Sequence, residues 1–452
     1  MIKKEIFREY DIRGIYEEEL NSSDAYLIGQ ALGTIMLEKK ESTTIVGQDN
    51  RMSSPILTNQ LIKGLLNTGI NVIDIGIATT PMVMCACDIL NIKCRIAVTA
   101  SHNPKEYNGF KISYNGTYNA CGKEIEEIYN VICNNKFKKG IGEYHQKNIN
   151  KEYIDMIIKD IKLQNKKKII YDCGNGTTSI IIKEVLSKLN VNSIGLFDIS
   201  DGNFPNHHPD PSLENNLQRL KQSVIENKAD IGIAFDGDGD RVGIVDELGN
   251  VIPTDKLMII VIRAFVNQYK NKGILYDIKC SKALEDEIIK LKLKPVICRT
   301  GASYTRKKLY TNKYPFGGEL SGHMYFNDRS YPGYDDGIYN ALRIIEILTN
   351  SNKPLSKLLN NINLYYSTKE LIIKVTDTTK FAIVNEVKNY CETKKYNFLT
   401  IDGVKIIYED ATAVIRASNT GPNLTLRFEA TTEEKLKLIQ DEYMTLLNKL
   451  IK

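Results

Sequence analysis

The sequence predicts an α/β protein: three related α/β domains with mixed, mainly parallel sheets, followed by a smaller α+β domain. Two observations lead to this fold class. Short apolar runs typical of strands alternate with amphipathic stretches typical of helices, and this order recurs three times before the pattern changes near residue 368. The length of 452 residues also accommodates three or four domains of roughly 100 to 150 residues each.

Each of the first three domains contributes a set of expected strands, with helices such as 54–66 between them. The expected strands are residues 44–46, 72–75 and 96–98 in the first domain, 168–171, 193–196 and 231–235 in the second, and 274–276, 296–298 and 314–316 in the third. The last domain has the order strand, helix, strands, helix, over residues 371–375, 380–393, 411–415, 424–428 and 432–450. Expected linkers at 134–151 and 361–368 place the domains at 1–150, 151–252, 253–366 and 367–452.

Composition excludes several classes of protein. Hydrophobic residues make up 42% of the chain and charged residues 25%, as in ordinary globular proteins, and the net charge of +5 is not concentrated in a basic block that would bind nucleic acid. The first residues lack the apolar stretch of a signal peptide, and Arg263 interrupts the longest apolar run, 257–266. Nine cysteines without paired C-x-x-C spacing suit a reducing compartment, and Cys85 and Cys87 lie among core residues. We therefore expect a cytoplasmic protein without a membrane segment.

The loop at residues 99–104 (Thr-Ala-Ser-His-Asn-Pro) follows the third expected strand. It places a small hydroxyl residue, Ser101, among polar loop formers. A serine at this point is expected to be exposed and able to carry a covalent group.

A second loop, Asp236-Gly237-Asp238-Gly239-Asp240-Arg241, lies between the apolar runs 231–235 and 242–245. Three carboxylates alternating with glycine suit a hard cation such as Mg²⁺, which takes oxygen ligands, whereas a solvated acidic turn would leave their repulsion unbalanced. The spacing also fits the first positions of an EF-hand. That loop, however, requires glycine where Arg241 stands, and helices where strands are expected. A catalytic Mg²⁺ site is preferred.

Two further glycine-containing loops carry polar groups. Residues 317–323 (Gly-Gly-Glu-Leu-Ser-Gly-His) offer a carboxylate, a hydroxyl and an imidazole, which hydrogen-bond sugar hydroxyls and move protons, but the same composition also describes a polar turn. Residues 416–423 (Arg-Ala-Ser-Asn-Thr-Gly-Pro-Asn) offer an arginine fork and backbone N–H groups for a phosphate, or an ordinary hairpin turn.

The first three loops share a position, because each follows the last expected strand of its α/β domain. Ligands of open α/β sheets bind at the carboxyl ends of strands. Three such domains facing inward would therefore assemble one composite site.

With these loops in this order, the chain resembles the α-D-phosphohexomutase family, in its phosphomannomutase/phosphoglucomutase branch. The resemblance covers essentially the whole chain. The segments that carry it are 7–14 (Phe-Arg-Glu-Tyr-Asp-Ile-Arg-Gly), 99–104, 107–111 (Tyr-Asn-Gly-Phe-Lys), 201–209 (Asp-Gly-Asn-Phe-Pro-Asn-His-His-Pro), 236–241, 299–301 (Arg-Thr-Gly), 317–323 and 416–421.

The resemblance implies four domains around a central cleft and an isomerase that interconverts hexose 1-phosphate and hexose 6-phosphate. Ser101 would be the phosphoserine, and Mg²⁺ would bind its phosphate together with Asp236, Asp238 and Asp240. Phosphoserine would give its phosphoryl group to the sugar and so form hexose 1,6-bisphosphate. This bisphosphate would turn end for end, and the serine would recover the other phosphoryl group. Hexose 1,6-bisphosphate would also serve as activator. Only sugar phosphates are implied as partners, in a monomer or small homo-oligomer.

The resemblance also assigns substrate contacts. The anchor of the non-transferring phosphate would be Arg416, Ser418, Asn419, Thr420 and Gly421, and Glu319 and Ser321 would hold sugar hydroxyls in both orientations. Arg13, Lys111 and His323 would line the reacting end, where Lys111 or His323 handles the hydroxyl proton or stabilises charge. Arg241 would face the transferring phosphoryl group or form a structural salt bridge. The remaining substrate contacts would be Tyr10, His102, Arg299 and Gly301, whereas His207 and His208 are expected to fix their turn.

Two positions depart from the family pattern. Leu320 stands where methionine is frequent, and Arg299 where the branch often has lysine; an arginine does not readily deprotonate. The loop 317–323 argues against phosphoglucosamine mutase, which stays an alternative, and mannose is not distinguished from glucose. A sugar-phosphate phosphatase and a non-catalytic binding protein are the other readings; the intact serine and aspartate loops oppose the second.

Overall fold

The computed structural model describes residues 2–418 and 421–451. Its first β-sheet is mixed. Its strands, in spatial order, are β1 (Ile12–Ile15), β5 (Tyr107–Ser113), β4 (Cys94–Val98), β2 (Thr43–Gln48), β3 (Asn71–Ile77) and β6 (Tyr144–Gln146). The pairs β4–β2, β2–β3 and β3–β6 are parallel, and β1–β5 and β5–β4 are antiparallel. The expected strands are therefore confirmed, but the expected linker 134–151 contains β6, an exposed edge strand without an apolar alternation to reveal it.

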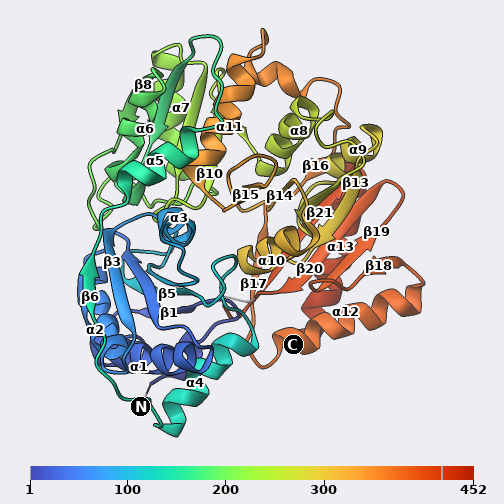
Figure 1. Cartoon of the computed structure of the whole chain (residues 1–452). Helices are drawn as coiled ribbons and strands as arrows, with labels where there is room; N and C mark the ends of the chain where they lie inside the picture. The colour runs from blue at the N-terminus through green and yellow to red at the C-terminus, as the bar shows by residue number, and fades with distance from the viewer. Residues whose placement is uncertain (1, 419–420, 452) are drawn as a thin grey trace. The chain divides into compact units, whose positions relative to one another are not determined.

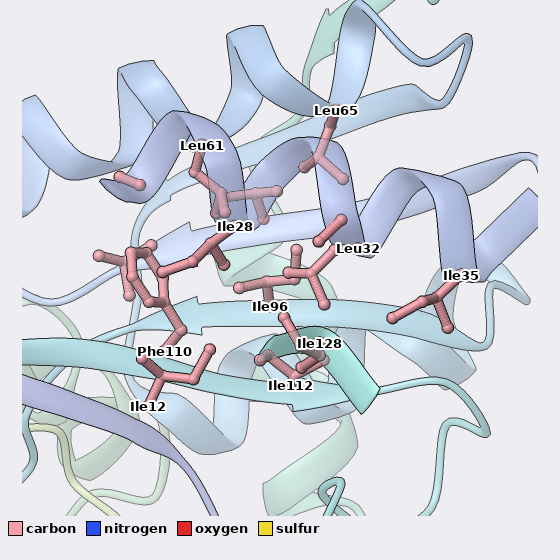
Figure 2. Packing of buried hydrophobic residues seen from close by; sticks show 14 of the residues in the cluster. Ile12, Ile28, Leu32, Ile35, Leu61, Leu65, Ile96, Phe110, Ile112 and Ile128 are labelled. Atoms are coloured by element: carbon pink, nitrogen blue, oxygen red, sulfur yellow. The ribbon is translucent and has the colours of Figure 1, made fainter. Parts of the chain in front are cut away.

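Helices pack their apolar faces on this sheet. They are α1 (Ser22–Glu38), α2 (Ser54–Leu66), α3 (Thr80–Leu90) and α4 (Lys123–Asn134). A capping box formed by Asn21 and Asp24 starts α1. Figure 2 shows Ile28 and Leu32 of α1 and Leu61 of α2 gathered above Ile96 of β4, and all four are fully buried. Each contributes about 1.5–3 kcal/mol by burial, which holds β4 and the loop that follows it in place.

The second sheet has the order β11 (Val251–Ile252), β10 (Val242–Asp246), β9 (Ile231–Phe235), β7 (Lys168–Asp172) and β8 (Asn192–Leu196). Strand β7 pairs in parallel with β8 and β9, whereas β9–β10 is an antiparallel hairpin. The helices here are α5 (Asn150–Ile158), α6 (Ile182–Lys188) and α7 (Gln218–Glu226). The turn of the β9–β10 hairpin carries the three aspartates.

The third α/β region begins with α8 (Thr254–Ala264) and the parallel pair β12 (Gly273–Asp277) and β13 (Lys294–Cys298). It continues with α9 (Lys282–Lys290), α10 (Ala302–Asn312), β14 (Phe316–Gly318), β15 (Met324–Phe326) and α11 (Gly337–Thr349). The strand expected at 314–316 begins instead at Phe316, because Pro315 has no N–H to donate to a ladder.

The last region is an antiparallel sheet with two helices. Its strands, in spatial order, are β16 (Tyr366–Ser367), β21 (Asn423–Ala430), β20 (Ala411–Ala417), β19 (Val404–Ile407) and β18 (Asn397–Leu399), with β17 (Leu371–Lys374) also paired to β21. The helices are α12 (Lys380–Lys394) and α13 (Glu433–Leu450). Short 3-10 helices lie at Lys4–Ile6, Thr177–Ile180, Glu214–Leu217 and Leu355–Leu359. Figure 1 labels most of these elements, and three α/β regions followed by an α+β region confirm the predicted fold class.

Contacts divide the chain into two units. Unit 1 comprises residues up to 254, 306–316 and 321–358, and unit 2 comprises 255–305, 317–320 and 359 onward. The division passes through the loop 317–323. In the described part of the chain, no helix combines the length and apolar character needed to cross a membrane.

Candidate active site

Ser101 lies in unit 1, in the loop that follows β4. Its hydroxyl donates a hydrogen bond to Asp236 Oδ2 at 2.9 Å, and its N–H donates to Thr99 Oγ1 at 2.9 Å. The backbone at Ser101 is left-handed, with a φ of 51°, a conformation that raises the energy of a non-glycine residue by roughly 1–2 kcal/mol. The expectation of an exposed serine is wrong, since Ser101 is only 2% exposed: the aspartate turn closes over it.

The three aspartates of the β9–β10 turn form a compact buried group. Asp236, Asp238 and Asp240 are each no more than 1% exposed, and one carboxylate oxygen from each lies within 4.8 Å of the others. Gly239 has a φ of 77°, which this tight turn requires. The flanking elements are strands, so the EF-hand alternative is wrong.

The turn also approaches the loop of residues 99–106 closely, which we call the serine loop. A Cβ added to Gly237 would lie 2.6 Å from the carbonyl oxygen of Ser101, closer than a real Cβ contact allows. Glycine at 237 is therefore what permits Ser101 and Asp236 to share a hydrogen bond.

The donor set fits a hard cation. Burial, followed by repulsion from Asp240 and Asp238, raises the pKa of Asp236 well above its ordinary value. Among the described residues, neither Asp238 Oδ1 nor Asp240 Oδ1 has a hydrogen-bond partner, although both atoms are buried. Buried carboxylate oxygens that repel each other and lack donors suggest a metal site of all-oxygen ligands.

Lys111 of β5 lies against the same carboxylates. Its Nζ donates to Asp238 Oδ2 at 2.7 Å and to Asp240 Oδ2 at 2.5 Å. Burial would lower the pKa of Lys111, but the two aspartates raise it above its ordinary range. Lys111 is therefore a fixed positive charge in this geometry.

Arg13 of β1 is tied to the serine loop. Its Nη1 donates to Asn103 Oδ1 at 2.7 Å, and its Nη2 donates to Asp11 Oδ2 at 2.5 Å. Tyr10 lies in the bend just before this strand and is half-buried. Both residues are thus on the segment that adjoins the loop of Ser101.

Arg241 links the aspartate turn to His323. Its backbone N–H donates to Asp236 Oδ1 at 3.0 Å, and its side-chain Nε donates to His323 Nε2 at 3.1 Å. His323 Nδ1 lies 3.4 Å from Asp335 Oδ2 and 3.7 Å from Asp240 Oδ1. Arg241 therefore both braces the turn and faces the imidazole.

His102 adjoins the same group from the serine loop. Burial, reinforced by the charges of Arg241 and Arg13, lowers its pKa well below the ordinary value, so the ring is neutral. His207 instead contacts Asp172 at 3.1 Å and the His208 carbonyl at 2.9 Å, which agrees with the expectation that it fixes its turn.

Unit 2 contains most of the other predicted residues. Glu319 accepts a hydrogen bond from the N–H of Gly301 at 3.0 Å. Arg416 lies inside β20, and its Nε donates to Asp402 Oδ2 at 2.9 Å. Asp402 also accepts from the N–H of Thr300 at 3.0 Å, so one carboxylate joins the Arg-Thr-Gly segment to the arginine strand.

The remaining predicted contacts have various settings. The guanidinium of Arg299 lies 4.0 Å from the ring centroid of Tyr304, and Ser321, in unit 1, is half-buried. The carbonyls of Ser418 and Gly421 accept from Lys380 Nζ at 2.8 and 3.2 Å. The predicted phosphate contacts Asn419 and Thr420 lie outside the described residues.

Sequence reasoning missed the residues that support these loops. Thr80 donates its hydroxyl to Asp238 Oδ2 at 2.5 Å, and Asp277 accepts from Thr300 Oγ1 at 3.0 Å and the Leu320 N–H at 3.1 Å. The sequence offered a signal for two of these supporting residues, since Asp277 ends a strand and Asp402 precedes a glycine. Thr80 carries no such signal, because its partner is 158 positions away.

Four family models cover nearly the entire chain. They describe domains I, II and III (α/β/α) and the C-terminal domain of phosphoglucomutase/phosphomannomutase, and they match residues 4–139, 151–249, 253–365 and 370–446. The chain belongs to the phosphoglucomutase/phosphomannomutase family. Membership confirms the resemblance drawn from the loops, and members of this family are isomerases.

Relatives in the family are similar over their full lengths. A phosphomannomutase/phosphoglucomutase of Pseudomonas syringae pv. tomato is 40% identical over 444 residues, 98% of this chain and 95% of the relative. A phosphoglucomutase of Neisseria meningitidis serogroup A is 34% identical over 450 residues, 99% and 97%. The crystal structure of a phosphoglucomutase/phosphomannomutase family protein from Burkholderia thailandensis matches with a TM-score of 0.93 at 34% identity, covering 100% of this chain and 98% of that one.

Proposed function

We propose that this chain is a phosphohexomutase that interconverts the 1- and 6-phosphates of mannose, glucose or both, through a phosphoserine at Ser101 and a hexose 1,6-bisphosphate intermediate. The observation that carries the proposal is the 2.9 Å hydrogen bond between the Ser101 hydroxyl and one carboxylate of the buried aspartate group. This contact supports a role for the Ser101 hydroxyl as the nucleophile beside a divalent cation. Family membership supports the same reaction class.

The first step would move the phosphoryl group from Ser101 Oγ to the free hydroxyl of the bound hexose monophosphate. The serine O–P bond breaks, a sugar O–P bond forms, and the proton that the sugar hydroxyl loses is balanced by one that Ser101 Oγ gains as it becomes a hydroxyl. After reorientation of the bisphosphate, the Ser101 hydroxyl attacks the other phosphoryl group and the sequence reverses. Such transfers depend on positioning and on charge stabilisation.

Asp236, Asp238 and Asp240 would hold Mg²⁺, together with an oxygen of the phosphate on Ser101. When bound there, Mg²⁺ would neutralise charge on the transferring phosphoryl group. Lys111, whose pKa the aspartates raise, would supply fixed positive charge. His323 would take the proton of the sugar hydroxyl, and Arg13 and Arg241 would stabilise phosphoryl oxygens.

The other substrate contacts are proposed on loops of each unit. Arg416, with Ser418, Asn419, Thr420 and Gly421, would anchor the phosphate that is not transferred. Glu319 and Ser321 would hold sugar hydroxyls, and Tyr10, His102, Arg299 and Gly301 would be the remaining substrate contacts. The matched family domains support assigning a phosphoserine domain to 1–150, a metal domain to 151–252, a sugar domain to 253–366 and a phosphate-binding domain to 367–452.

We place this activity in the cytoplasm. All nine cysteines are free thiols in the structure, and eight of them are buried, which suits a reducing compartment. The proposed partners are sugar phosphates alone, with hexose 1,6-bisphosphate as activator.

Coupled assays test the proposal. Purified protein with Mg²⁺ and a trace of hexose 1,6-bisphosphate is given mannose 1-phosphate, glucose 1-phosphate or glucosamine 1-phosphate, and formation of the 6-phosphate is followed beside release of inorganic phosphate. We expect turnover of mannose or glucose phosphate and little free phosphate. A preference above about a thousandfold, some 4 kcal/mol in transition-state binding, would define a specialist. Phosphate release at the rate of isomer formation would contradict a mutase and favour a phosphatase.

A further inference from the structure

Arg51 is a fully buried charge directly beneath the serine loop. It follows β2, and its side chain is 0% exposed, one of the largest fully buried side chains among the described residues. No part of it is available to a substrate. Its role must therefore be exerted through the protein groups that it contacts.

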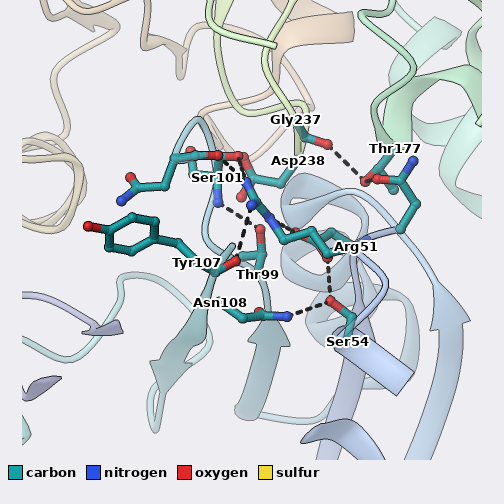
Figure 3. A network of polar contacts seen from close by, with 12 residues as sticks. Arg51, Ser54, Thr99, Ser101, Tyr107, Asn108, Thr177, Gly237 and Asp238 are labelled. Carbon is teal, nitrogen blue, oxygen red and sulfur yellow. Dashed lines mark hydrogen bonds and ion pairs between the residues drawn. The ribbon is translucent and has the colours of Figure 1, made fainter. Parts of the chain in front are cut away.

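Every N–H of the Arg51 guanidinium has a partner. Nε donates to Asp49 Oδ2 at 3.0 Å. The four remaining N–H groups donate to carbonyl oxygens of one loop: those of Pro104 (2.6 Å), Tyr107 (3.1 Å), Ser101 (2.7 Å) and Asn103 (2.7 Å). The side chain thus fixes the backbone from Ser101 to Tyr107, as Figure 3 shows for Arg51, Ser101 and Tyr107.

The guanidinium is itself held by a second layer of contacts. Asp49 Oδ1 accepts a hydrogen bond from Ser54 Oγ at 2.5 Å and one from the backbone N–H of Arg51 at 3.1 Å. Asn108, at the other end of the serine loop, donates to Ser54 Oγ at 2.9 Å (Figure 3). The fork therefore has one orientation, set by β2, α2 and β5.

The loop needs such a support. Ser101 holds a left-handed backbone, and its carbonyl is turned between Arg51 and Gly237, where a Cβ at Gly237 would come within 2.6 Å. Without the guanidinium, four carbonyls would lose their hydrogen bonds to it, that of Ser101 in a fully buried position, and the loop would relax to a different backbone. A relaxed loop would move Ser101 Oγ away from Asp236.

We propose that Arg51 is a positioning residue for phosphoryl transfer, which sets the Ser101 hydroxyl against the aspartate group by binding the carbonyls of residues 101, 103, 104 and 107. This inference rests on the proposed mutase function. It assigns Arg51 an effect on the transfer step and none on sugar-phosphate capture, because all of its donors are committed to the protein.

The test is Arg51→Lys, which keeps the charge but replaces a planar five-donor fork with a point charge of three donors. A displacement of the nucleophile by about 1 Å is expected to lower kcat by roughly 100-fold. The KM for the hexose phosphate should stay within about threefold of the wild-type value.

Arg343→Lys is the matched control. Arg343 is also 0% exposed and in unit 1, but it pairs with Asp328, at 2.7 Å, and not with a carboxylate that adjoins the serine loop. Both variants remove an arginine fork from the interior, so a general loss of stability would affect both. We expect kcat of Arg343→Lys to remain within about threefold of wild type, with thermal unfolding measured on all proteins.

The outcomes separate the inference from the proposed function. If wild-type protein shows no mutase activity, the proposed function fails. If wild type is active and Arg51→Lys retains its kcat, or changes KM alone, the positioning role is refuted. Should Arg51→Lys fail to fold, Asp49→Asn is the second variant: it loosens the anchor of Nε and is expected to lower kcat by roughly tenfold at constant KM, and an unchanged kcat refutes the role.

Discussion

Replacing Asp336 with asparagine is expected to change how stability depends on pH. Asp336 is 0% exposed and caps the start of α11 by accepting a hydrogen bond from the Tyr339 N–H at 3.0 Å. Its carboxylate also accepts from the hydroxyls of Tyr331 at 2.7 Å and Tyr153 at 2.9 Å. The next residue, Gly337, donates its N–H to the Gly239 carbonyl of the aspartate turn at 2.9 Å, so this cap supports the candidate site.

The magnitude follows from the pKa of the buried carboxyl. Burial raises the pKa of Asp336 from 3.8 to about 6 despite four hydrogen bonds that favour the charged form. The neighbouring groups Tyr153, Tyr331 and Cys85 stay neutral between pH 5 and 8, because burial raises their pKa values well above the ordinary ones. Asp336 is thus the group in this cluster that titrates there.

The sign is set by the raised pKa. The folded protein binds this proton more tightly than the unfolded chain, so the stabilisation is fully present below pH 3.8 and is lost as the pH rises through about 6. A shift of about two units corresponds to about 3 kcal/mol in total, of which about 1.4 kcal/mol is lost between pH 5 and pH 8.

Asparagine keeps the cap acceptor and stays neutral, so Asp336→Asn escapes this loss. Thermal unfolding of both proteins at pH 5 and pH 8 measures the difference, which should shift in favour of the variant by about 2 °C at the higher pH. A difference in Tm between variant and wild type that is the same at both pH values would refute the reasoning.

Two further substitutions, one in each unit, test the proposed function. Gly237→Ala places a Cβ 2.6 Å from the Ser101 carbonyl oxygen, so the two loops must separate. We expect kcat to fall roughly 10- to 100-fold and the Mg²⁺ concentration for half-maximal activity to rise. Unchanged kinetics would contradict the close approach of the two loops. Arg416→Ala removes the proposed phosphate fork and should raise the KM for hexose phosphate roughly 10- to 100-fold with a smaller change in kcat, as expected for a lost hydrogen bond to a charged group; Arg416→Lys should lie between, and a loss confined to kcat would exclude the anchor role.

The elements nearest the chemistry were the most predictable from sequence. The apolar runs on both sides of the aspartates gave β9 and β10 within a residue, because a buried strand needs little besides its own apolar side chains. The strand expected at 314–316 was displaced by Pro315, and β6 escaped notice because an exposed edge strand has no apolar face. The pattern of apolar residues therefore predicts a strand only where the strand is buried by its own apolar side chains.

The support of the site was not predictable in the same way. Arg51 is separated from Ser101 by 50 positions, and nothing in its immediate sequence indicates that it binds four carbonyls of another loop. The burial of Ser101 also depends on a turn 135 positions away. Glu319 and His323 are four positions apart, yet they group with different units, which adjacency in sequence cannot reveal. Such features arise from tertiary packing.

The transfer of phosphorus to Ser101 is the most direct test of the central claim. The protein is mixed with isotopically phosphorus-labelled hexose 1-phosphate under turnover conditions, quenched within a few catalytic cycles and digested, and the peptide containing residue 101 is analysed. We predict label on Ser101, its removal by a chase of unlabelled substrate, and neither label nor turnover in Ser101→Ala. Isomer formed at full rate while residue 101 never carries label would contradict the account.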